Sequence, residues 1–404
     1  MYVGLHFFKT NTLRIANADL YLSTYMKKTF LIALTLCFAV LVSAAEKVTL
    51  ETLQADWNKY NNQVVTLTTP LVVCGNFYDS LVLAPQRLYC PEEFAVGLAD
   101  GDSTLYYQII EQNKQNSICV HCRNAYYDVR TGDIIKNITA RVTSERHLLT
   151  GKSLRTKHTK QAPLPKKNKN HLRVVGTNIE NYFADLGGYA TRKTTPAQQQ
   201  VKTQKVVKAL HKMDADIFAI CEMQQGDRAP LMLLAELNKK GNQYDYVNLG
   251  LPNQDQISGA FIYNKERVRP YAEWLSAYSA ATSHYHTRLI AQGFELLDQK
   301  GQPTGKKLIV NVNHFKSKRA GRQAYSTHMR RLANTDSLLI MLPKAVERFE
   351  DSDILLLGDY NCYTQETPIQ KIVRAGYADM LQAFCAQDYS YNYKGLVGYL
   401  DRCF

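Results

Sequence analysis

The sequence predicts a layered α/β domain that follows a small β domain. From Arg173 onward, short apolar runs alternate with segments that repeat apolar residues at helical spacing. Residues 46–150 instead contain short alternating stretches separated by turn residues. Strands interleaved with helices are typical of layered α/β proteins, and closely spaced short strands are typical of antiparallel β modules. A chain of 404 residues is long enough for both.

Residues 26–45 have the organisation of a secretory signal peptide. Met26, Lys27 and Lys28 give a positive start, and an apolar stretch ends in small residues at Ala45. The stretch is short for a membrane span. We therefore expect an exported protein, periplasmic or secreted, with no stable membrane span in the mature chain; a membrane anchor is the alternative. Residues 1–25 carry no pattern, and we expect them to be an over-extended start.

Eight cysteines follow the predicted signal peptide: Cys74, Cys90, Cys119, Cys122, Cys221, Cys362, Cys385 and Cys403. Some of them should form disulfides in an oxidising compartment, and Cys362 lies close to Cys385 in the sequence. The first four could alternatively form a zinc site. Cys221 lies in an apolar run and is expected to be a buried thiol.

The small β domain is assigned to residues 46–150 and a basic linker to residues 151–172. Residues 131–151 resemble the closing strands of an OB-type barrel, which precedes some exported nucleases; an unspecified β module is the alternative. The linker is rich in Lys and Arg, and the formal net charge of the chain is +13. Such a balance favours polyanionic partners such as nucleic acid, although solvated lysines would give the same charge.

The larger domain is assigned to residues 173–404. Its expected helices include one that begins at Thr195 and Pro196, an N-cap followed by a first-turn proline. Its expected strands are residues 173–177, 216–221, 260–263, 308–312 and 354–357.

Four segments with polar residues lie where predicted strands end: residues 177–181, 219–222, 310–317 and 355–361. Because a strand has a period of two, Asn178 should share a face with Glu180, and Asp359 with Asn361. His314 is the first polar residue on its face after an apolar stripe. Polar side chains that follow buried strands usually line a cleft at the edge of a sheet.

These residue types suit the hydrolysis of a phosphodiester. Carboxylate and amide oxygens are the ligands that Mg²⁺ prefers. We expect Glu222 to hold the metal, and Asn178 and Asn361 to orient the phosphate or the attacking water. Asp359 could then deprotonate that water, and His314 could donate a proton or hydrogen bond to the phosphate.

In order, the four segments resemble the motifs of the endonuclease/exonuclease/phosphatase superfamily. The resemblance covers residues 173–404 and implies a four-layer α/β sandwich of two facing mixed sheets. It also implies a metal-dependent phosphodiesterase that uses Mg²⁺ or Mn²⁺, with Ca²⁺ as a further alternative.

The resemblance assigns a role to each matching residue. Asn178 and Glu222 would bind the metal, and Glu180 would be a secondary acidic residue near it. The catalytic residues would be His314, Asp359, Asn361 and Asp401. The expected phosphate-binding residues are Asn178, Asn313, Lys316, Lys318 and Arg331, of which the basic ones could alternatively be a solvated loop and helix face.

The C-terminal residues resemble a family strand in which Asp401 supports a catalytic histidine. Arg402 stands where many relatives have histidine. The family normally continues to an S-D-H-x-P segment, but the sequence stops at Phe404. We therefore expect a fragment, a frameshifted gene or a truncated gene model. If the polypeptide ends here, we expect severely reduced catalysis and an unfinished sheet edge.

The sequence thus predicts an exported nuclease that cleaves DNA or RNA. A phosphodiesterase or phosphatase for lipid or inositol headgroups is one alternative, and a catalytically inactive, basic nucleic-acid-binding protein is another. The sequence leaves the choice of DNA or RNA, endo- or exo-cleavage and the oligomeric state open.

Overall fold

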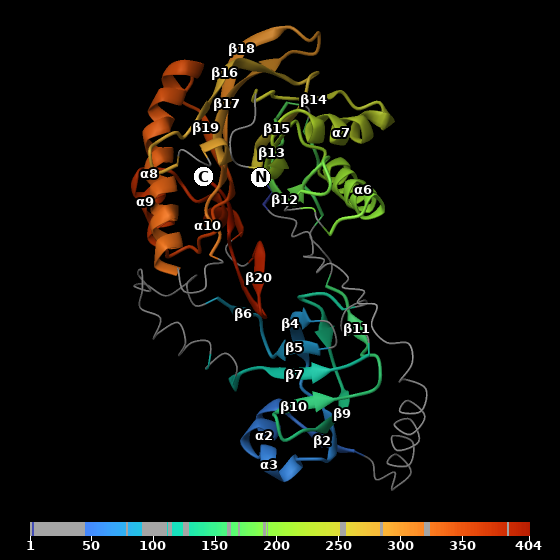
Figure 1. Ribbon diagram of the computed structural model, residues 1–404. Coiled ribbons are helices and arrows are strands. Elements are labelled where there is room, and N and C mark those ends of the chain that lie inside the picture. The colour runs from blue at the N-terminus through green and yellow to red at the C-terminus, as the bar shows by residue number, and fades with distance from the viewer. Residues whose placement is uncertain are drawn as a thin grey trace. The chain divides into compact units, whose positions relative to one another are not determined.

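The computed structural model describes residues 2–3, 45–77, 80–90, 111, 115–123, 129–159, 163–168, 170–188, 191, 193–250, 256–282, 286–318, 324–385 and 388–404. The chain divides into two compact units (Figure 1). The smaller unit contains residues 8–88 and 112–160, and the larger contains residues 1–7, 89–111 and 161–404. All of the predicted signal peptide except Ala45 lies outside the described residues.

The boundary between the units differs from the predicted one. The sequence suggested a continuous small domain over residues 46–150, whereas residues 89–111 belong to the larger unit. The backbone amide of Cys90 donates to the carbonyl of Val397 at 2.7 Å, which ties the start of this segment to the larger unit.

The smaller unit is a β structure, as predicted. Its strands are β2 (Glu46–Val48), β3 (Val64–Leu67), β4 (Leu71–Phe77), β5 (Ser80–Ala84), β7 (Ile118–His121), β8 (Ile134–Ile135), β9 (Ile138–Val142), β10 (His147–Leu149) and β11 (Thr156–Lys157). They form one sheet in the order β11-β8-β4-β5-β7-β10-β9-β3-β2. Helices α2 (Leu50–Ala55) and α3 (Trp57–Tyr60) add Leu53 and Trp57 to its apolar core. The OB-type barrel stays a prediction.

The first sheet of the larger unit has the order β1-β12-β13-β15-β14. Its strands are β1 (Tyr2–Val3), β12 (Val174–Tyr182), β13 (Ile217–Gln224), β14 (Tyr244–Tyr246) and β15 (Ile257–Asn264). One face packs against helices α6 (Pro196–Met213) and α7 (Arg228–Leu237), where Leu210 and Leu233 join the apolar core. Thr195 caps α6 with the predicted proline at its first turn, because its hydroxyl accepts from the amide of Gln198.

The second sheet has the order β16-β17-β18-β19-β22. Its strands are β16 (Val268–Ser276), β17 (Leu289–Leu297), β18 (Pro303–His314), β19 (Ile354–Asp359) and β22 (Asp401–Cys403). Helices α8 (Ala324–Phe349) and α9 (Thr367–Arg374) cover one face through residues such as Leu338 and Ile372. Helix α10 (Met380–Cys385) and the pair β20 (Tyr391–Tyr393) and β21 (Leu396–Gly398) precede β22, and β6 (Leu88–Tyr89) pairs with β21.

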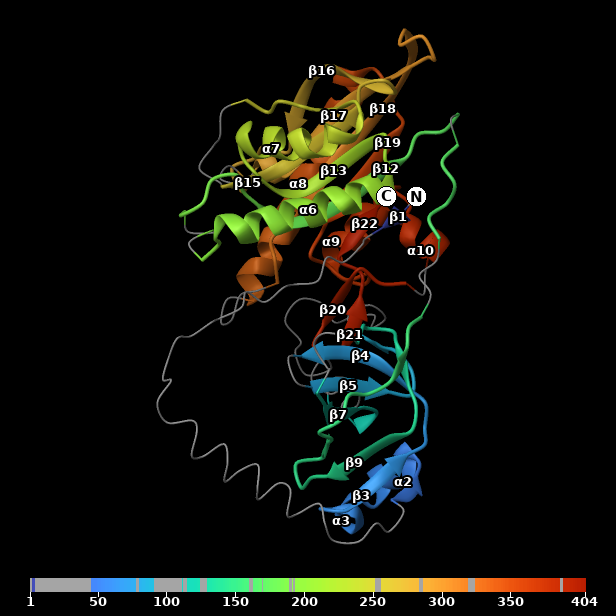
Figure 2. The same cartoon turned by 90° about the vertical axis from the view of Figure 1, so that its right-hand side faces the viewer.

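The two sheets face each other across a third apolar layer. Phe261 of β15 packs edge-on against Phe294 of β17, and Val310 and Val312 complete this layer from β18. In Figure 1, the layers run from α8 and α9 through the two sheets to α6 and α7, and Figure 2 looks onto the layer of α6 and α7, with the sheets behind it. Each sheet contains parallel and antiparallel pairs. The predicted four-layer sandwich of two facing mixed sheets is therefore confirmed.

Two further sequence predictions have an outcome in the fold. The sequence predicted disulfides among the eight cysteines without fixing their pairing, and Cys362 and Cys385, which lie close in the sequence, are both thiols. Cys362 packs in the apolar core, whereas Cys385 lies at the end of α10. Cys221 is a fully buried thiol, as predicted. None of the helices in the described part of the chain has the length and apolar character needed to cross a membrane.

Gly358 fixes the end of β19, just before Asp359. Its φ of +134° is unfavourable for other residues, and a Cβ atom there would lie 2.0 Å from the carbonyl oxygen of Asn313. We expect Gly358→Ala to lower the free energy of unfolding by about 3 kcal/mol or more, measured by urea denaturation. Gly188→Ala is the control, because a Cβ there meets nothing nearer than 4.0 Å. Equal stability of the two variants would contradict this account.

Candidate active site

Bulges in two neighbouring strands of the first sheet mark the start of the site. The pairing of β12 with β13 shifts register between Asn178 and Tyr182, and Glu180 and Asn181 both have a φ of +56°. The pairing of β13 with β15 shifts after Ile220, and Glu222 has a φ of +67°. Bulges re-aim side chains, and left-handed backbone at residues other than glycine is strained, a feature that clusters at functional sites.

Two short-range hydrogen bonds fix the polar side chains at the strand ends. Asn178 Oδ1 accepts from the amide of Glu180 at 2.8 Å, and Asp359 Oδ1 accepts from the amide of Asn361 at 2.9 Å. Both are turns in which a side chain bonds the backbone two residues later. Each turn leaves the other end of its side chain available for contacts across the site.

Asn178 bridges the two sheets. Its Nδ2 donates to Glu222 Oε1 at 2.9 Å and to Asp359 Oδ2 at 3.1 Å, although β12 and β19 belong to different sheets. His314 Nε2 lies 3.5 Å from the same Oε1 of Glu222. Asn178, Glu222, His314 and Asp359, from four different strands, therefore meet at one end of the sandwich.

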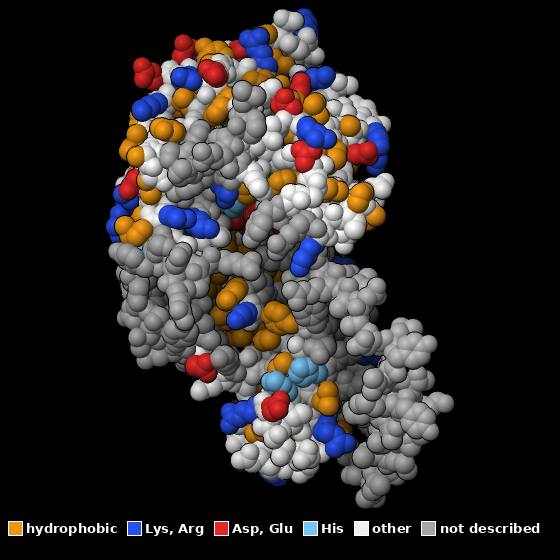
Figure 3. All heavy atoms as spheres, in the orientation of Figure 1, with side chains coloured by type: hydrophobic (Ala, Val, Ile, Leu, Met, Phe, Trp, Pro, Cys, Tyr) orange, Lys and Arg blue, Asp and Glu red, His pale blue; other side chains and the backbone are white. Residues whose placement is uncertain are grey.

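Strand register adds Asp401 to this cluster. His314 is the register partner of Asp359 in the parallel pair β18 and β19, and Asp359 is the partner of Asp401 in the antiparallel pair β19 and β22. These three side chains form a row on the face toward the first sheet. Figure 3 shows acidic and histidine side chains in a recess of the larger unit.

The carboxylates of the row perturb one another. Burial, followed by the nearby charge of Asp359, raises the pKa of Asp401 well above its ordinary value. Burial also raises the pKa of Asp359, an effect that Glu222 reinforces and His314 opposes. Both aspartates keep some exposed surface although protein surrounds them. Carboxylates held this close disfavour full ionisation unless a cation neutralises them.

The donor set fits a divalent metal ion. Glu222, Asp359 and Asp401 offer carboxylate oxygens, the ligands of Mg²⁺ and Mn²⁺, and their mutual repulsion would be relieved by a cation. His314 is buried, and its Nδ1 has no hydrogen-bond partner among the described residues. A buried nitrogen without a partner favours a bound polar group, such as a water molecule.

Comparison with known proteins identifies the family. The model of the Endonuclease/Exonuclease/phosphatase family matches residues 179–399, more than half of the 404-residue chain. The chain belongs to this family. A comparison with curated proteins gave no match.

Several solved structures are similar to this member of the family. An endonuclease/exonuclease/phosphatase from Bacteroides vulgatus has 16% identity and a TM-score of 0.43, with 58% of this chain and 86% of that chain covered. The mannosyl-6-phosphatase of Bacteroides thetaiotaomicron has 14% identity and a TM-score of 0.40, with 58% and 85% covered. TDP2 of D. rerio, complexed with a single strand DNA product, has 14% identity and a TM-score of 0.39, with 57% and 82% covered.

Lys202 is a neighbour of the site that the sequence did not reveal. Its Nζ, on α6, donates to the carbonyls of Glu180 and Asn181, which are the two left-handed residues of the β12 bulge. Burial lowers the pKa of Lys202, while the charges of Glu180 and Glu222 partly oppose this. Lys202 therefore stabilises the strained turn that holds Asn178.

Two predicted residues, Glu180 and Asn361, lie off the centre of the cluster. The bulge and the left-handed backbone of Glu180 break the period-two relation between Asn178 and Glu180. Asn361 turns away after β19, and its Nδ2 donates to the carbonyl of Phe315 at 3.1 Å. Asn361 thus remains beside the end of β18, next to His314.

Asn313 is not placed to bind phosphate with its side chain. It lies on the opposite face of β18 from His314, where its Nδ2 donates to the hydroxyl of Tyr360 at 2.8 Å and to Asn311. Because neighbouring strand residues point to opposite faces, Asn313 supports the layer beneath α8 instead.

The predicted phosphate-binding cations gather around another carboxylate. Lys318 Nζ forms an ion pair with Glu366, and Arg331 Nη2 lies 3.7 Å from Glu366 Oε2. Arg331 Nη1 also donates to the carbonyl of Lys316 at 3.4 Å. Burial alone would raise the pKa of Glu366, but Lys318 and Arg331 hold this pKa below its usual value. Lys318 and Arg331 therefore neutralise a buried carboxylate of the protein itself.

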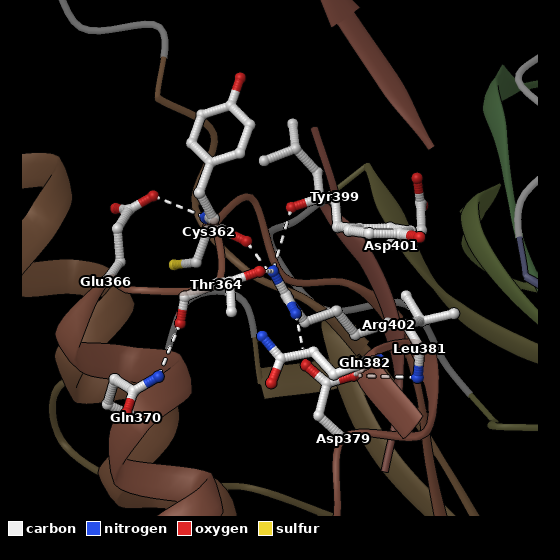
Figure 4. Close-up of polar contacts among 12 residues, drawn as sticks. Cys362, Thr364, Glu366, Gln370, Asp379, Leu381, Gln382, Tyr399, Asp401 and Arg402 are labelled. Atoms are coloured by element: carbon white, nitrogen blue, oxygen red, sulfur yellow. Dashed lines mark hydrogen bonds and ion pairs between the residues drawn. The ribbon is translucent and has the colours of Figure 1, made fainter. Parts of the chain in front are cut away.

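Arg402 is a structural residue. It points away from Asp401 and is almost fully buried, with Nη1 2.5 Å from Asp379 Oδ2 (Figure 4). Its Nη2 donates to Thr364 Oγ1 at 2.9 Å, and its Nε donates to the carbonyl of Cys362 at 3.4 Å. The guanidinium thus joins β22 to the segments that contain Cys362 and Asp379.

The Arg402–Asp379 pair provides a test of this structural role. We expect Arg402→Met to lower the free energy of unfolding by about 3–5 kcal/mol, because it leaves the buried carboxylate of Asp379 without its cation. Adding Asp379→Asn removes that charge but keeps an N-cap residue for α10, so most of the stability should return. Urea denaturation of both variants measures this, and equal losses in the two would contradict it.

The Glu366 cluster predicts a pH dependence of stability. A lowered pKa in the folded state stabilises the fold above the ordinary glutamate pKa of about 4.3, and this contribution is lost as the pH falls through the folded-state pKa. We expect Glu366→Gln to cost about 3 kcal/mol at pH 7 and clearly less at pH 3.5, by urea denaturation. The exposed Glu347→Gln is the control, with no pH-dependent difference expected. A constant cost at both pH values would refute the assignment.

Proposed function

We propose that the chain is an exported, divalent-metal-dependent phosphodiesterase that hydrolyses nucleic acid. Membership of the family supports a phosphoesterase-type hydrolase. The observation that carries the proposal is the bridge from Asn178 to Glu222 and Asp359, at 2.9 Å and 3.1 Å. It lies beside His314, whose buried Nδ1 has no partner among the described residues. Residues 26–45 support export through their signal-peptide pattern.

The residues divide the work of hydrolysis. Asp359, with its raised pKa, accepts a proton from the attacking water, whose oxygen forms the new bond to phosphorus. His314 donates a hydrogen bond from Nδ1 to a phosphate oxygen, and the Asn178 amide keeps Glu222 and Asp359 in place. The ester P–O bond then breaks, the leaving oxygen takes up a proton from solvent water, and Asp359 releases its proton to solvent. A bound Mg²⁺ or Mn²⁺, held by Glu222, would neutralise charge on the phosphate.

Charge favours nucleic acid as the substrate. The formal net charge of +13 and the basic linker of residues 151–172 would attract a phosphate backbone. Of the predicted phosphate contacts, Lys318 and Arg331 are engaged with Glu366, so the basic linker carries more of this argument.

Removing the metal ligand tests the proposal. We expect Glu222→Gln to reduce cleavage of plasmid DNA or RNA by about 1,000-fold or more, because a lost metal contact removes several kcal/mol of transition-state stabilisation. EDTA should abolish the wild-type cleavage, and added Mg²⁺ or Mn²⁺ should restore it. Glu236→Gln is the matched control, because this surface residue of α7 pairs with Lys239 away from the site.

Parallel assays separate the alternatives. Hydrolysis of sphingomyelin, inositol phosphates or a sugar phosphate without cleavage of nucleic acid would agree with the metal-dependent mechanism. It would contradict the proposal that nucleic acid is the substrate. Binding of a labelled oligonucleotide without cleavage of any substrate would identify a binding protein. Cleavage that survives both EDTA and Glu222→Gln would reject the proposed centre.

A further inference from the structure

A second cluster of metal-ligating side chains lies on the smaller unit. Cys119, His121 and His147 each direct one ligand atom into a common space, and these atoms all lie within 4.8 Å of one another. Each side chain is half-buried. Figure 3 shows histidine side chains together on the surface of this unit, over the position of β7 in Figure 1.

Strand periodicity and register bring the three residues together. Cys119 and His121 are two residues apart on β7, so both point to the outer face, while Val120 faces the apolar core. Strand β10 pairs in parallel with β7, which makes His147 the register partner of Cys119. His147 is therefore a lateral neighbour of Cys119 and a diagonal neighbour of His121 on the same face.

The distances match a tetrahedral site. Zn²⁺ with Zn–N bonds of about 2.05 Å and a Zn–S bond of about 2.3 Å holds two nitrogens about 3.3 Å apart and a nitrogen and a sulfur about 3.6 Å apart. His121 Nε2 lies 3.3 Å from His147 Nδ1, and Cys119 Sγ lies 3.9 Å from His121 Nε2. Small side-chain rotations would complete the geometry.

The backbone holds the ligands in place. The amide of Thr150 donates to the carbonyl of His121 at 3.0 Å. The amide of His147 donates to Thr143 Oγ1 at 3.2 Å, and its carbonyl accepts from the amide of Thr143 at 2.9 Å. Both strands are therefore fixed at the ligand positions, which reduces the conformational entropy that binding would remove.

We propose that Cys119, His121 and His147 bind one Zn²⁺ ion, with the fourth position open to water or another ligand. One thiolate and two imidazoles are ligands for zinc rather than for Mg²⁺ or Ca²⁺. This set differs from the zinc site suggested by the sequence. Cys122 packs in the core, and the thiol of Cys74 donates to backbone carbonyls at 3.6 Å and 3.7 Å.

The bound ion cross-links β7 and β10, which are separated by more than twenty residues of sequence. Because a ligand that binds only the folded state stabilises it, Zn²⁺ should raise the thermal stability of this unit. A direct hydrogen bond between the two imidazoles accounts for their distance equally well, but it involves no sulfur and creates no affinity for zinc.

Zinc binding by the full-length protein tests the inference. The protein is purified with a non-metal-binding reductant, treated with a chelator and titrated with ZnCl₂ by calorimetry. All measurements use a Glu222→Gln background, so that the proposed catalytic cation does not contribute. We expect one Zn²⁺ per chain and a Zn²⁺-dependent rise in Tm. Substitution with Co²⁺ should give a thiolate charge-transfer absorption band.

Variants separate direct ligands from supporting residues. Cys119→Ser and His147→Ala should each raise the Zn²⁺ dissociation constant by more than about 100-fold. Removing a residue that only supports a ligand typically weakens metal affinity by less than this. The controls are Cys385→Ser and the exposed His171→Ala, which should retain the wild-type affinity. Circular dichroism confirms that each variant is folded. Unchanged affinity in Cys119→Ser and His147→Ala, no binding by the folded parent, or Cys119 in a disulfide would each overturn the proposal.

Discussion

The larger unit depends on one constraint: carboxylates from two facing sheets must be held close together at the end of an apolar interior. Between the sheets, residues such as Phe261, Phe294 and Val312 exclude water. Immediately beyond them come Glu222 and Asp359, whose charges repel each other. The amide of Asn178 donates to both, which stabilises an arrangement that the carboxylates alone would disfavour. The two bulges, the two side-chain turns and Lys202 all act on the segments that carry these groups.

The basic residues show why net charge is an incomplete guide to binding. Arg402 is buried on Asp379, and Lys318 and Arg331 surround Glu366. Lys318 and Arg331 were predicted to bind phosphate, and Arg402 stands at a motif position. Each of the three instead neutralises the charge of a buried carboxylate of the protein. A buried carboxylate requires such a partner, and a sequence does not indicate which cation is used in this way.

The sequence predicted the layers and most of the site because both follow from strand patterns. Apolar runs located the strands, and the polar residues at their ends located Asn178, Glu222, His314 and Asp359. The failures share a physical cause. A bulge changes the face of every later residue, so period two misplaced Glu180. Asn313 was predicted to bind phosphate because of its residue type. Its neighbour His314 points to the face of β18 that carries the site, so Asn313 points to the opposite face. Lys202 reaches the site from a helix, and no local pattern marks a contact of that kind.

Strand register, which the sequence did not supply, builds both candidate metal centres. It aligns His314, Asp359 and Asp401 in one row, and it sets His147 beside Cys119. The two centres nevertheless differ in donor chemistry. The first is dominated by enclosed carboxylate oxygens, which suit a hard cation, whereas the second offers a thiolate and two imidazoles. The thiolate and imidazoles disfavour Mg²⁺, whereas carboxylates accept both Mg²⁺ and Zn²⁺, so only the first centre is expected to bind Mg²⁺. The two centres can be told apart through their residues, because removing Cys119 or His147 would leave the carboxylate row intact.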